Sequence, residues 1–181
     1  MAGTATARLW QRVDRAEQAL CLRINRGCHR TSLRRFFVVA SRLGDGIAWY
    51  ALMASLAVAG GAPGTTAAMQ MAVAGSVGVL LYRVLKTRLV RERPFISYAA
   101  IRLGTAPLDR YSFPSGHTLH AVCFTTLALA HFPALAVLLV PFAVAVAASR
   151  VVLGLHYPTD VAAGAALGAT LADLTLRFWP G

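Results

Sequence analysis

Residues 149–160 read SRVVLGLHYPTD, and they separate two segments that are too apolar for an ordinary soluble domain. The stretch holds three polar residues of interest, Arg150, His156 and Asp160. Charged groups are costly beside lipid and are usually kept there for function. Pro158 suits the first turn of a helix, so we expect His156 in the preceding loop and Asp160 in the opening turn of that helix.

The residue types in this stretch suit a phosphate-like anion. A carboxylate beside a histidine can hold the imidazole in one tautomer and stabilise its cationic form, which leaves the other ring nitrogen free to attack or bind. The guanidinium of Arg150 offers paired donors to an oxyanion. The stretch therefore predicts a phosphate-handling histidine site at a membrane surface.

The composition indicates an integral membrane protein of one domain. The 181 residues are 57% hydrophobic and 14% charged, with a mean hydropathy of +0.58, whereas an average soluble domain is about 25% charged. The net charge of +11 is concentrated in residues 1–42 (+7) and 83–110 (+5), which flank apolar segments. This placement favours membrane lipids over nucleic acid as the partner. Three cysteines without metal-ligand spacing predict neither a metal site nor a disulfide framework.

Charge-free runs predict about five membrane spans. Residues 46–82 contain no Asp, Glu, Lys or Arg, and a single helix of that length would measure about 55 Å against a hydrocarbon core of about 30 Å. The same argument divides residues 111–149. We therefore expect spans near 45–61, 65–84, 116–131, 133–149 and 158–178, with turns at 60–64 and 131–133.

The N-terminal residues 1–42 form a separate, basic segment in this interpretation, and residues 43–181 form the transmembrane domain. Residues 5–30 alternate an apolar side with an arginine-rich side, which is typical of a helix lying in the membrane interface. A helix that packs on the core or on a partner is the alternative. The predicted fold is thus an all-α, multi-pass helical bundle preceded by an amphipathic helix. The positive-inside rule makes its charged side cytoplasmic.

A second candidate cluster lies at residues 86–94 (KTRLVRERP), after the second predicted span. Lys86 is the only lysine of the chain, and its ammonium together with the guanidinium of Arg93 can neutralise two sides of a dianion. Arg88 and Arg91 are interpreted as contacts to lipid headgroups. A basic loop after a membrane span is usually only such an anchor, so this cluster needs support from others.

A third cluster, residues 114–117 (PSGH), opens the third predicted span. Ser115 can cap the helix, and Gly116 lets a ligand approach the free amides at the positive helix end. His117, in the first turn, is placed to give a proton to a leaving group. A histidine at a helix mouth is more often structural than catalytic. It is the combination of three clusters that predicts an anion site.

Together the clusters resemble the three-part signature of the phosphatidic acid phosphatase type 2 and haloperoxidase superfamily. The matching positions are Lys86-x6-Arg93-Pro94, Pro114-Ser115-Gly116-His117 and Ser149-Arg150-x5-His156-x3-Asp160. The likeness spans about residues 45–178, and residues 1–42 fall outside its motifs. It implies a membrane phosphatase that requires no metal or other cofactor.

The resemblance also implies residue roles. His156 would be the nucleophile that forms a phosphohistidine, and Asp160 would orient it. His117 would protonate the leaving oxygen and then activate water. The phosphoryl oxygens would be held by Lys86, Arg93, Ser115, Gly116 and Arg150.

The predicted function is hydrolysis of a phosphorylated lipid in the cell (inner) membrane. Phosphatidic acid, phosphatidylglycerol phosphate and undecaprenyl diphosphate are all compatible with the sequence. The alternatives are a vanadium-dependent haloperoxidase-like enzyme and a catalytically silent lipid-binding membrane protein. The small-xxx-small pattern of Gly164 and Gly168 predicts close helix packing, within the monomer or between two copies. It leaves the oligomeric state open.

Overall fold

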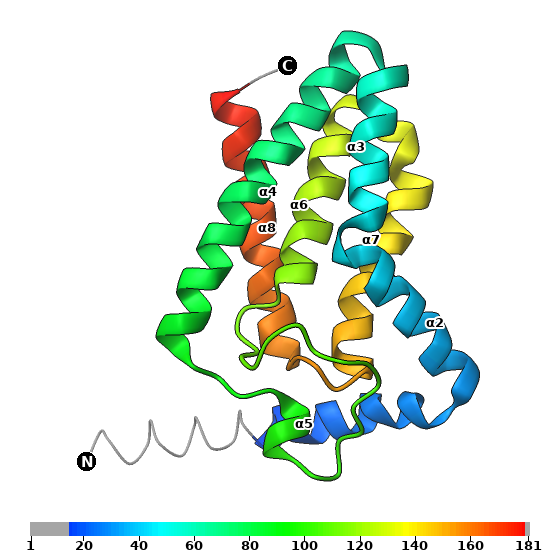
Figure 1. Ribbon diagram of the computed structural model, residues 1–181, viewed down its shortest axis with the longest axis vertical. Helices are drawn as coiled ribbons and strands as arrows, with labels where there is room; N and C mark the ends of the chain where they lie inside the picture. Colours follow the sequence, from blue (N-terminus) through cyan, green and yellow to red (C-terminus); the bar gives the residue numbers. More distant parts are fainter. Residues whose placement is uncertain (1–14, 180–181) are drawn as a thin grey trace.

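The computed structural model describes residues 15–179, and every named element within this range is a helix. The long helices form an upright bundle, with a shorter helical segment across one end (Figure 1). The bundle helices are α3 (Ala48–Ala59), α4 (Gly61–Leu89), α6 (Gly116–His131), α7 (Ala136–Val152) and α8 (Pro158–Phe178). The predicted all-α membrane bundle is therefore confirmed.

The predicted turns near residues 60–64 and 131–133 are present in the structure. The first hairpin turns between Ala59 and Gly61, and the second turns after His131 through the short helix η3 (Pro133–Leu135). Pro158 occupies the first turn of α8, and it leaves His156 in the loop before that helix. These turns could be predicted locally. Proline restricts the backbone angle φ and glycine permits angles that other residues avoid, whatever the distant contacts are.

Helix α6 lies at the centre of the bundle, against α4, α7 and α8 (Figure 1). Among residues 15–179, four helical segments are long and apolar enough to cross a membrane, and these are Thr31–Ala59, Gly61–Leu89, Pro133–Val152 and Pro158–Phe178. Helix α6 has 16 residues and is shorter than α7 and α8, which have 17 and 21. Large apolar side chains such as Val58, Val137 and Phe178 are more than four-fifths exposed, as a surface that contacts lipid requires.

The first predicted span begins earlier than the sequence pattern indicated. Helix α2 (Thr31–Arg42) runs into α3 through the helical turn η2 (Leu43–Ile47). Residues 44–46 form a kink, because Asp45 has non-helical angles and Gly46 has a φ of 127°, a region that favours glycine. Helix α2 packs against α7.

Residues 15–25 are helical and lead into η1 (Arg26–His29). Their buried positions are Glu17, Cys21 and Asn25, whereas Leu20 on the predicted apolar side is exposed. The described part of this helix thus packs on the protein through both polar and apolar side chains, because Leu22 and Ile24 also pack against the cluster around Cys21. Several residues of the predicted amphipathic pattern, including Trp10 and Arg12, lie outside the described residues.

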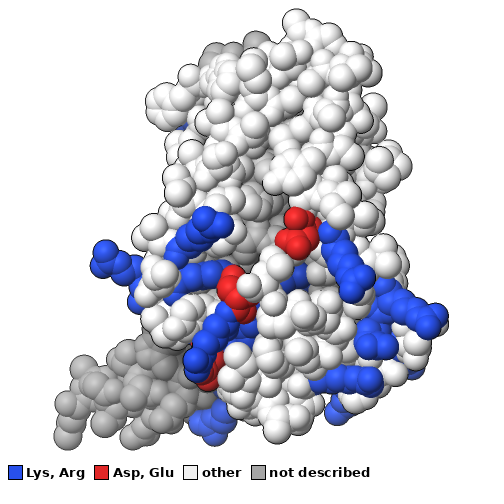
Figure 2. Space-filling view, in the orientation of Figure 1, with Lys and Arg blue, Asp and Glu red and all other residues white. Residues whose placement is uncertain are grey.

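Charged side chains gather at one end of the molecule. In Figure 2 the lower half carries nearly all of the visible Lys, Arg, Asp and Glu, and the upper half is almost uncharged. The lower end contains the loop between α4 and α6, with its short helix α5 (Pro94–Ser97), and the loop between α7 and α8 (Figure 1). The predicted arrangement of hairpins, with both basic regions on one side, agrees with this distribution.

Candidate active site

A cavity of about 490 Å³ opens at the charged end of the bundle. All three sequence clusters contribute to its wall, through Lys86, Arg93, Gly116, His117, Arg150 and His156. These side chains come from the end of α4, the loop after it, the first turn of α6, the last turn of α7 and the loop before α8. The fold therefore brings together polar residues that are up to 70 positions apart in the sequence.

The contacts of His156 select one tautomer of its imidazole. Nη1 of Arg93 lies 3.1 Å from Nε2 of His156 and also donates to the carbonyl oxygen of Leu155 at 2.8 Å. A guanidinium has no acceptor, so Nε2 must carry the lone pair and the ring proton must be on Nδ1. Nε2 is therefore the nucleophilic nitrogen of the neutral ring.

The electrostatic surroundings keep His156 neutral. The residue is 1% exposed. Burial, and then the neighbouring positive charges of which Arg150 acts most strongly, hold the pKa of His156 well below its ordinary value. A neutral imidazole can attack or bind an electrophile, whereas an imidazolium cannot.

Asp160 lies on the opposite side of the His156 ring. Its Oδ2 accepts a hydrogen bond from the backbone amide of Tyr157 at 2.8 Å, which closes a capping box at the start of α8. The same oxygen lies 3.6 Å from Nδ1 of His156, which is beyond hydrogen-bond distance. The carboxylate therefore faces the ring proton and acts on it through its charge.

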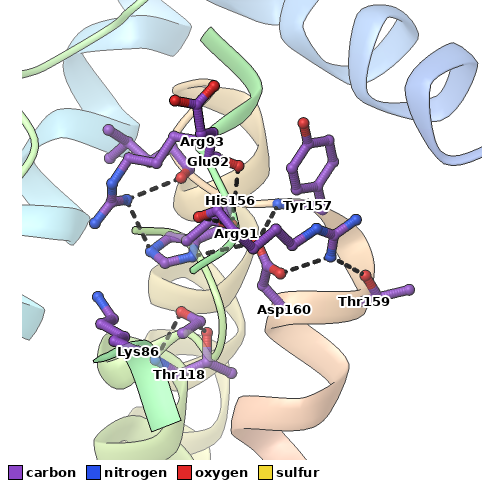
Figure 3. Close-up of polar contacts among 12 residues, drawn as sticks. Lys86, Arg91, Glu92, Arg93, Thr118, His156, Tyr157, Thr159 and Asp160 are labelled. Carbon is purple, nitrogen blue, oxygen red and sulfur yellow. Dashed lines mark hydrogen bonds and ion pairs between the residues drawn. The ribbon is translucent and has the colours of Figure 1, made fainter. Parts of the chain in front are cut away.

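Arg91 is bound to acidic side chains of the site, which its interpretation as a contact to lipid headgroups did not include. Its Nη1 donates to Oδ1 of Asp160 at 2.8 Å and to Oγ1 of Thr159 at 2.7 Å (Figure 3). Its guanidinium also lies 3.9 Å from the centre of the Tyr157 ring. The arginine was not separable from its basic neighbours by sequence alone, because only the tertiary fold brings α8 beneath it.

Asp109 forms ion pairs with two of the three cations that were expected to hold phosphate. Lys86 Nζ donates to its Oδ2 at 2.6 Å, and Arg93 Nη2 donates to its Oδ1 at 2.8 Å. Burial by itself would raise the pKa of Asp109, but the hydrogen bonds and charges of these two partners hold that pKa below its ordinary value. Asp109 was missed as a site residue. The sequence signal was weak, because Asp109 is one of two acids, with Glu92, in a basic segment.

His117 lies in the first turn of α6 and lines the cavity. Its Nε2 is 3.5 Å from Oδ1 of Asp45, at the kink between α2 and α3. Asp45 was not predicted as a site residue. A lone carboxylate next to an apolar span was the signal that could have identified it, since such groups are seldom kept without a partner.

His120, one turn further along α6, makes structural contacts. Its Nε2 lies 3.2 Å from the carbonyl oxygen of Gly75, and its ring stacks on Phe124 at 5.1 Å.

Arg150 is almost completely buried at the end of α7 and lines the cavity. Its Nη1 donates to Oγ of Ser41 on α2, and its Nε has no hydrogen-bond partner in the part of the chain that the structure describes. A buried donor without a partner is costly. This guanidinium is therefore available to an oxyanion in the cavity.

Ser115 lies behind the cavity wall and is not among the residues that line it. Its Oγ accepts from the amide of Thr118 at 3.4 Å, so it caps α6 as expected, and its own amide donates to the carbonyl oxygen of Asp160 at 3.0 Å. A contribution of Ser115 to phosphate binding stays a prediction. Its observed contacts join the starts of α6 and α8.

Two glycines allow α6 and α8 to approach each other. A Cβ on Gly164 would collide with the backbone oxygen of Ser115, and one on Gly168 with that of Leu119. Both glycines are buried inside the monomer. The small-xxx-small pattern thus serves packing within the chain, and it holds Asp160 close to the helix that carries His117.

Within residues 15–179, no group of three His, Cys, Asp or Glu side chains has the arrangement of a metal site. The cavity is instead lined by cations and imidazoles around a position suited to an anion. Such a site can bind a tetrahedral oxyanion, present it to Nε2 of His156 and exchange a proton through His117.

Comparison with known proteins agrees with this chemistry. Residues 67–181 match the family model of the PAP2 superfamily. Decaprenylphosphoryl-5-phosphoribose phosphatase of Mycobacterium tuberculosis is 40% identical over 106 residues, which cover 56% of this chain and 53% of that protein. The chain thus spans about half the length of the curated relatives it matches.

Two solved membrane proteins have similar structures. LpxE of Aquifex aeolicus superposes with a TM-score of 0.77 at 27% identity, covering 88% of this chain and 93% of its own. The transmembrane PAP2 type phosphatidylglycerolphosphate phosphatase of Bacillus subtilis superposes with a TM-score of 0.66 at 26% identity, covering 92% and 85%. Both likenesses include most of the bundle.

Proposed function

The chain belongs to the PAP2 superfamily, and on that premise we propose that it is an integral membrane phosphatase of lipid phosphates or diphosphates. One observation carries the proposal: three cationic side chains and a neutral, buried histidine line one cavity at the charged end of the bundle. A phosphoryl group is the common biological anion that needs several cations and a nucleophile together.

Substrate binding would use the cations in the cavity wall. Lys86, Arg93 and Arg150 would neutralise the phosphoryl oxygens. The backbone amides at the start of α6, including that of Gly116, would donate hydrogen bonds to a further oxygen. Asp109 holds two of these cations in the structure, so its carboxylate would have to yield to the incoming anion.

In the first chemical step, Nε2 of His156 would attack phosphorus and form a P–N bond while the P–O bond to the lipid breaks. His117 would give its proton to the departing lipid oxygen. The proton on Nδ1 of His156 remains in place, so the phosphohistidine carries a positive ring that faces the carboxylate of Asp160 at 3.6 Å. The negative charge of Asp160 would stabilise this intermediate.

In the second step, His117 would take a proton from water as the water oxygen attacks phosphorus. The P–N bond would break, returning neutral His156 and releasing inorganic phosphate. His117 would then hold the proton that it needs for the next lipid. The same two histidines thus serve both steps. His117 acts as the acid in the first step and as the base in the second.

The lipid part of the substrate would lie along the apolar wall of the same cavity. That wall is formed inside the bundle by Trp49, Met53, Met71, Val79 and Phe124. A phosphate headgroup at the charged end and a tail among these side chains would match the division of the molecule into polar and apolar halves (Figure 2). We place the protein in the cell (inner) membrane, with the charged end toward the cytoplasm by the positive-inside rule.

The test is release of phosphate from a panel of lipid phosphates by the purified protein in detergent. The panel contains phosphatidic acid, phosphatidylglycerol phosphate and a polyprenyl diphosphate. Turnover that persists with a chelator, is inhibited by vanadate and is lost in His156→Ala would support the proposal. Wild-type turnover in His156→Ala, or halide oxidation that depends on added vanadate in place of phosphate release, would overturn it.

A further inference from the structure

A chain of three charged residues connects the N-terminal helix to the candidate nucleophile. Glu17, on that helix, forms an ion pair with Nη2 of Arg91, and Nη1 of Arg91 donates to Oδ1 of Asp160 at 2.8 Å. Oδ2 of Asp160 then faces Nδ1 of His156. Three segments that are separated by more than 60 residues each meet in this chain.

Arg91 determines the orientation of the Asp160 carboxylate. Asp160 is 0% exposed, so both of its oxygens need partners within the protein. The amide of Tyr157 holds Oδ2 and Arg91 holds Oδ1. Without Arg91, Oδ1 would lose its charged partner, and the carboxylate would lose one of the contacts that fix its orientation beside the His156 ring.

Glu17 preserves the negative charge of this arrangement. A cationic Arg91 paired with Asp160 alone would form a neutral unit, which could do little to stabilise a positive phosphohistidine ring. With Glu17, which is itself buried, the three groups carry one net negative charge next to His156. Because buried charges are weakly screened, this net negative charge attracts a positive imidazole ring of His156.

Glu17 also holds the start of α8. Its Oε1 accepts from the backbone amide of Thr159 at 2.9 Å and from the hydroxyl of the same residue. These contacts leave Glu17 no freedom to serve a lipid headgroup. They place a carboxylate at the positive end of α8, one residue before Asp160.

We propose that Glu17 and Arg91 are positioning residues, through which the N-terminal helix sets the orientation and effective charge of Asp160. The inference rests on the proposed function, because it assigns the helix a part in that reaction. It gives residues before 67, where the family match begins, a task beyond membrane attachment. A merely structural ion pair would support the fold but would leave the chemical step unchanged.

The experiment measures kcat, KM and thermal unfolding of the purified full chain with the lipid phosphate that the wild-type protein hydrolyses. Glu17→Gln keeps the shape and the acceptor oxygen but removes the charge. Outer partners of a metal-bound histidine typically contribute about 10–100-fold in affinity or activity. Taking the same factor for this histidine, we expect kcat to fall by about 10–100-fold while KM changes less than about threefold. Arg91→Ala should fall at least as far, and Arg91→Lys should recover part of the loss.

The matched control is Arg110→Ala, which removes an arginine from the same polar loop. Its partner is Glu92 at 2.9 Å, and both side chains are largely exposed, so kcat should stay near the wild-type value. Rapid-quench measurement of phosphohistidine formation adds a second readout. That rate should slow in Glu17→Gln in proportion to kcat.

Unchanged kcat and phosphohistidine formation in Glu17→Gln, with Arg91→Lys equal to Arg91→Ala, would overturn the inference. A loss explained by KM alone, or by unfolding at the assay temperature in Glu17→Gln and Arg91→Lys alike, would also count against it. If the wild-type chain hydrolyses no lipid phosphate, it is the proposed function that fails. Active wild-type protein with insensitive variants would refute only the positioning role.

Discussion

Replacing Asp109 with asparagine should tighten the binding of phosphate-like anions. In the structure the carboxylate of Asp109 accepts from Lys86 at 2.6 Å and from Arg93 at 2.8 Å. These are two of the cations that the proposed reaction assigns to the phosphoryl oxygens. An incoming anion must therefore displace one negative group in order to gain the same two donors.

The size of the effect follows from the exposure of this carboxylate. A hydrogen bond to a charged group contributes about 1.5–3 kcal/mol when buried, and an exposed ion pair about 0.2–1 kcal/mol. The Asp109 side chain is 40% exposed, so we take an intermediate value of about 1 kcal/mol per contact. Asparagine keeps an acceptor oxygen, which leaves about 1–1.5 kcal/mol in favour of the anion, or roughly 5–10-fold in its dissociation constant.

The assay is inhibition of the purified protein by orthovanadate and by inorganic phosphate, with KM measured in parallel. The inhibition constants should fall about 5–10-fold in Asp109→Asn. Asp173→Asn is the matched control, because Asp173 pairs with Arg177 near the end of α8, away from the cavity, and both are exposed. Weaker inhibition in Asp109→Asn would refute the reasoning and would mean that Asp109 holds the cations ready for the anion.

Three further outcomes are expected. Gly168→Val should lower the stability of the protein by about 1–3 kcal/mol through overpacking against α6, measured by thermal unfolding against Ala169→Val on the exposed side of the same helix; equal effects would contradict the close contact. His156 has a lowered pKa, so the unfolded chain binds more protons below about pH 6.5 and stability should fall as pH drops through that value, less so in His156→Asn; an equal fall in both proteins would contradict this. A cysteine in place of Arg110, which is exposed while the native cysteines are buried, should react with an impermeant maleimide only from the cytoplasmic side; labelling from the other side would reverse the orientation.

The sequence by itself determined the bundle and identified the three cations and the two histidines to which the proposed reaction assigns binding and chemistry. Charge-free runs can only be long helices that cross a membrane, because lipid offers no partner to an open backbone. Turns at Gly60 and Pro133, the cap at Ser115 and the first turn at Pro158 depend on near neighbours, so they were readable locally. The three clusters were recognisable because their spacing is a property of the chain.

Only the tertiary structure decided what those residues contact. Asp45, Asp109 and Arg91 each contact a partner from a different segment. No periodicity or spacing in the sequence predicts these long-range contacts. The same holds for Gly168, whose pattern suited a dimer and a monomer equally until α6 was found against it. Local preferences act over a few residues, whereas the pairing of buried charges depends on how whole helices pack. The connection from Glu17 through Arg91 and Asp160 to His156 was therefore visible only in the tertiary structure.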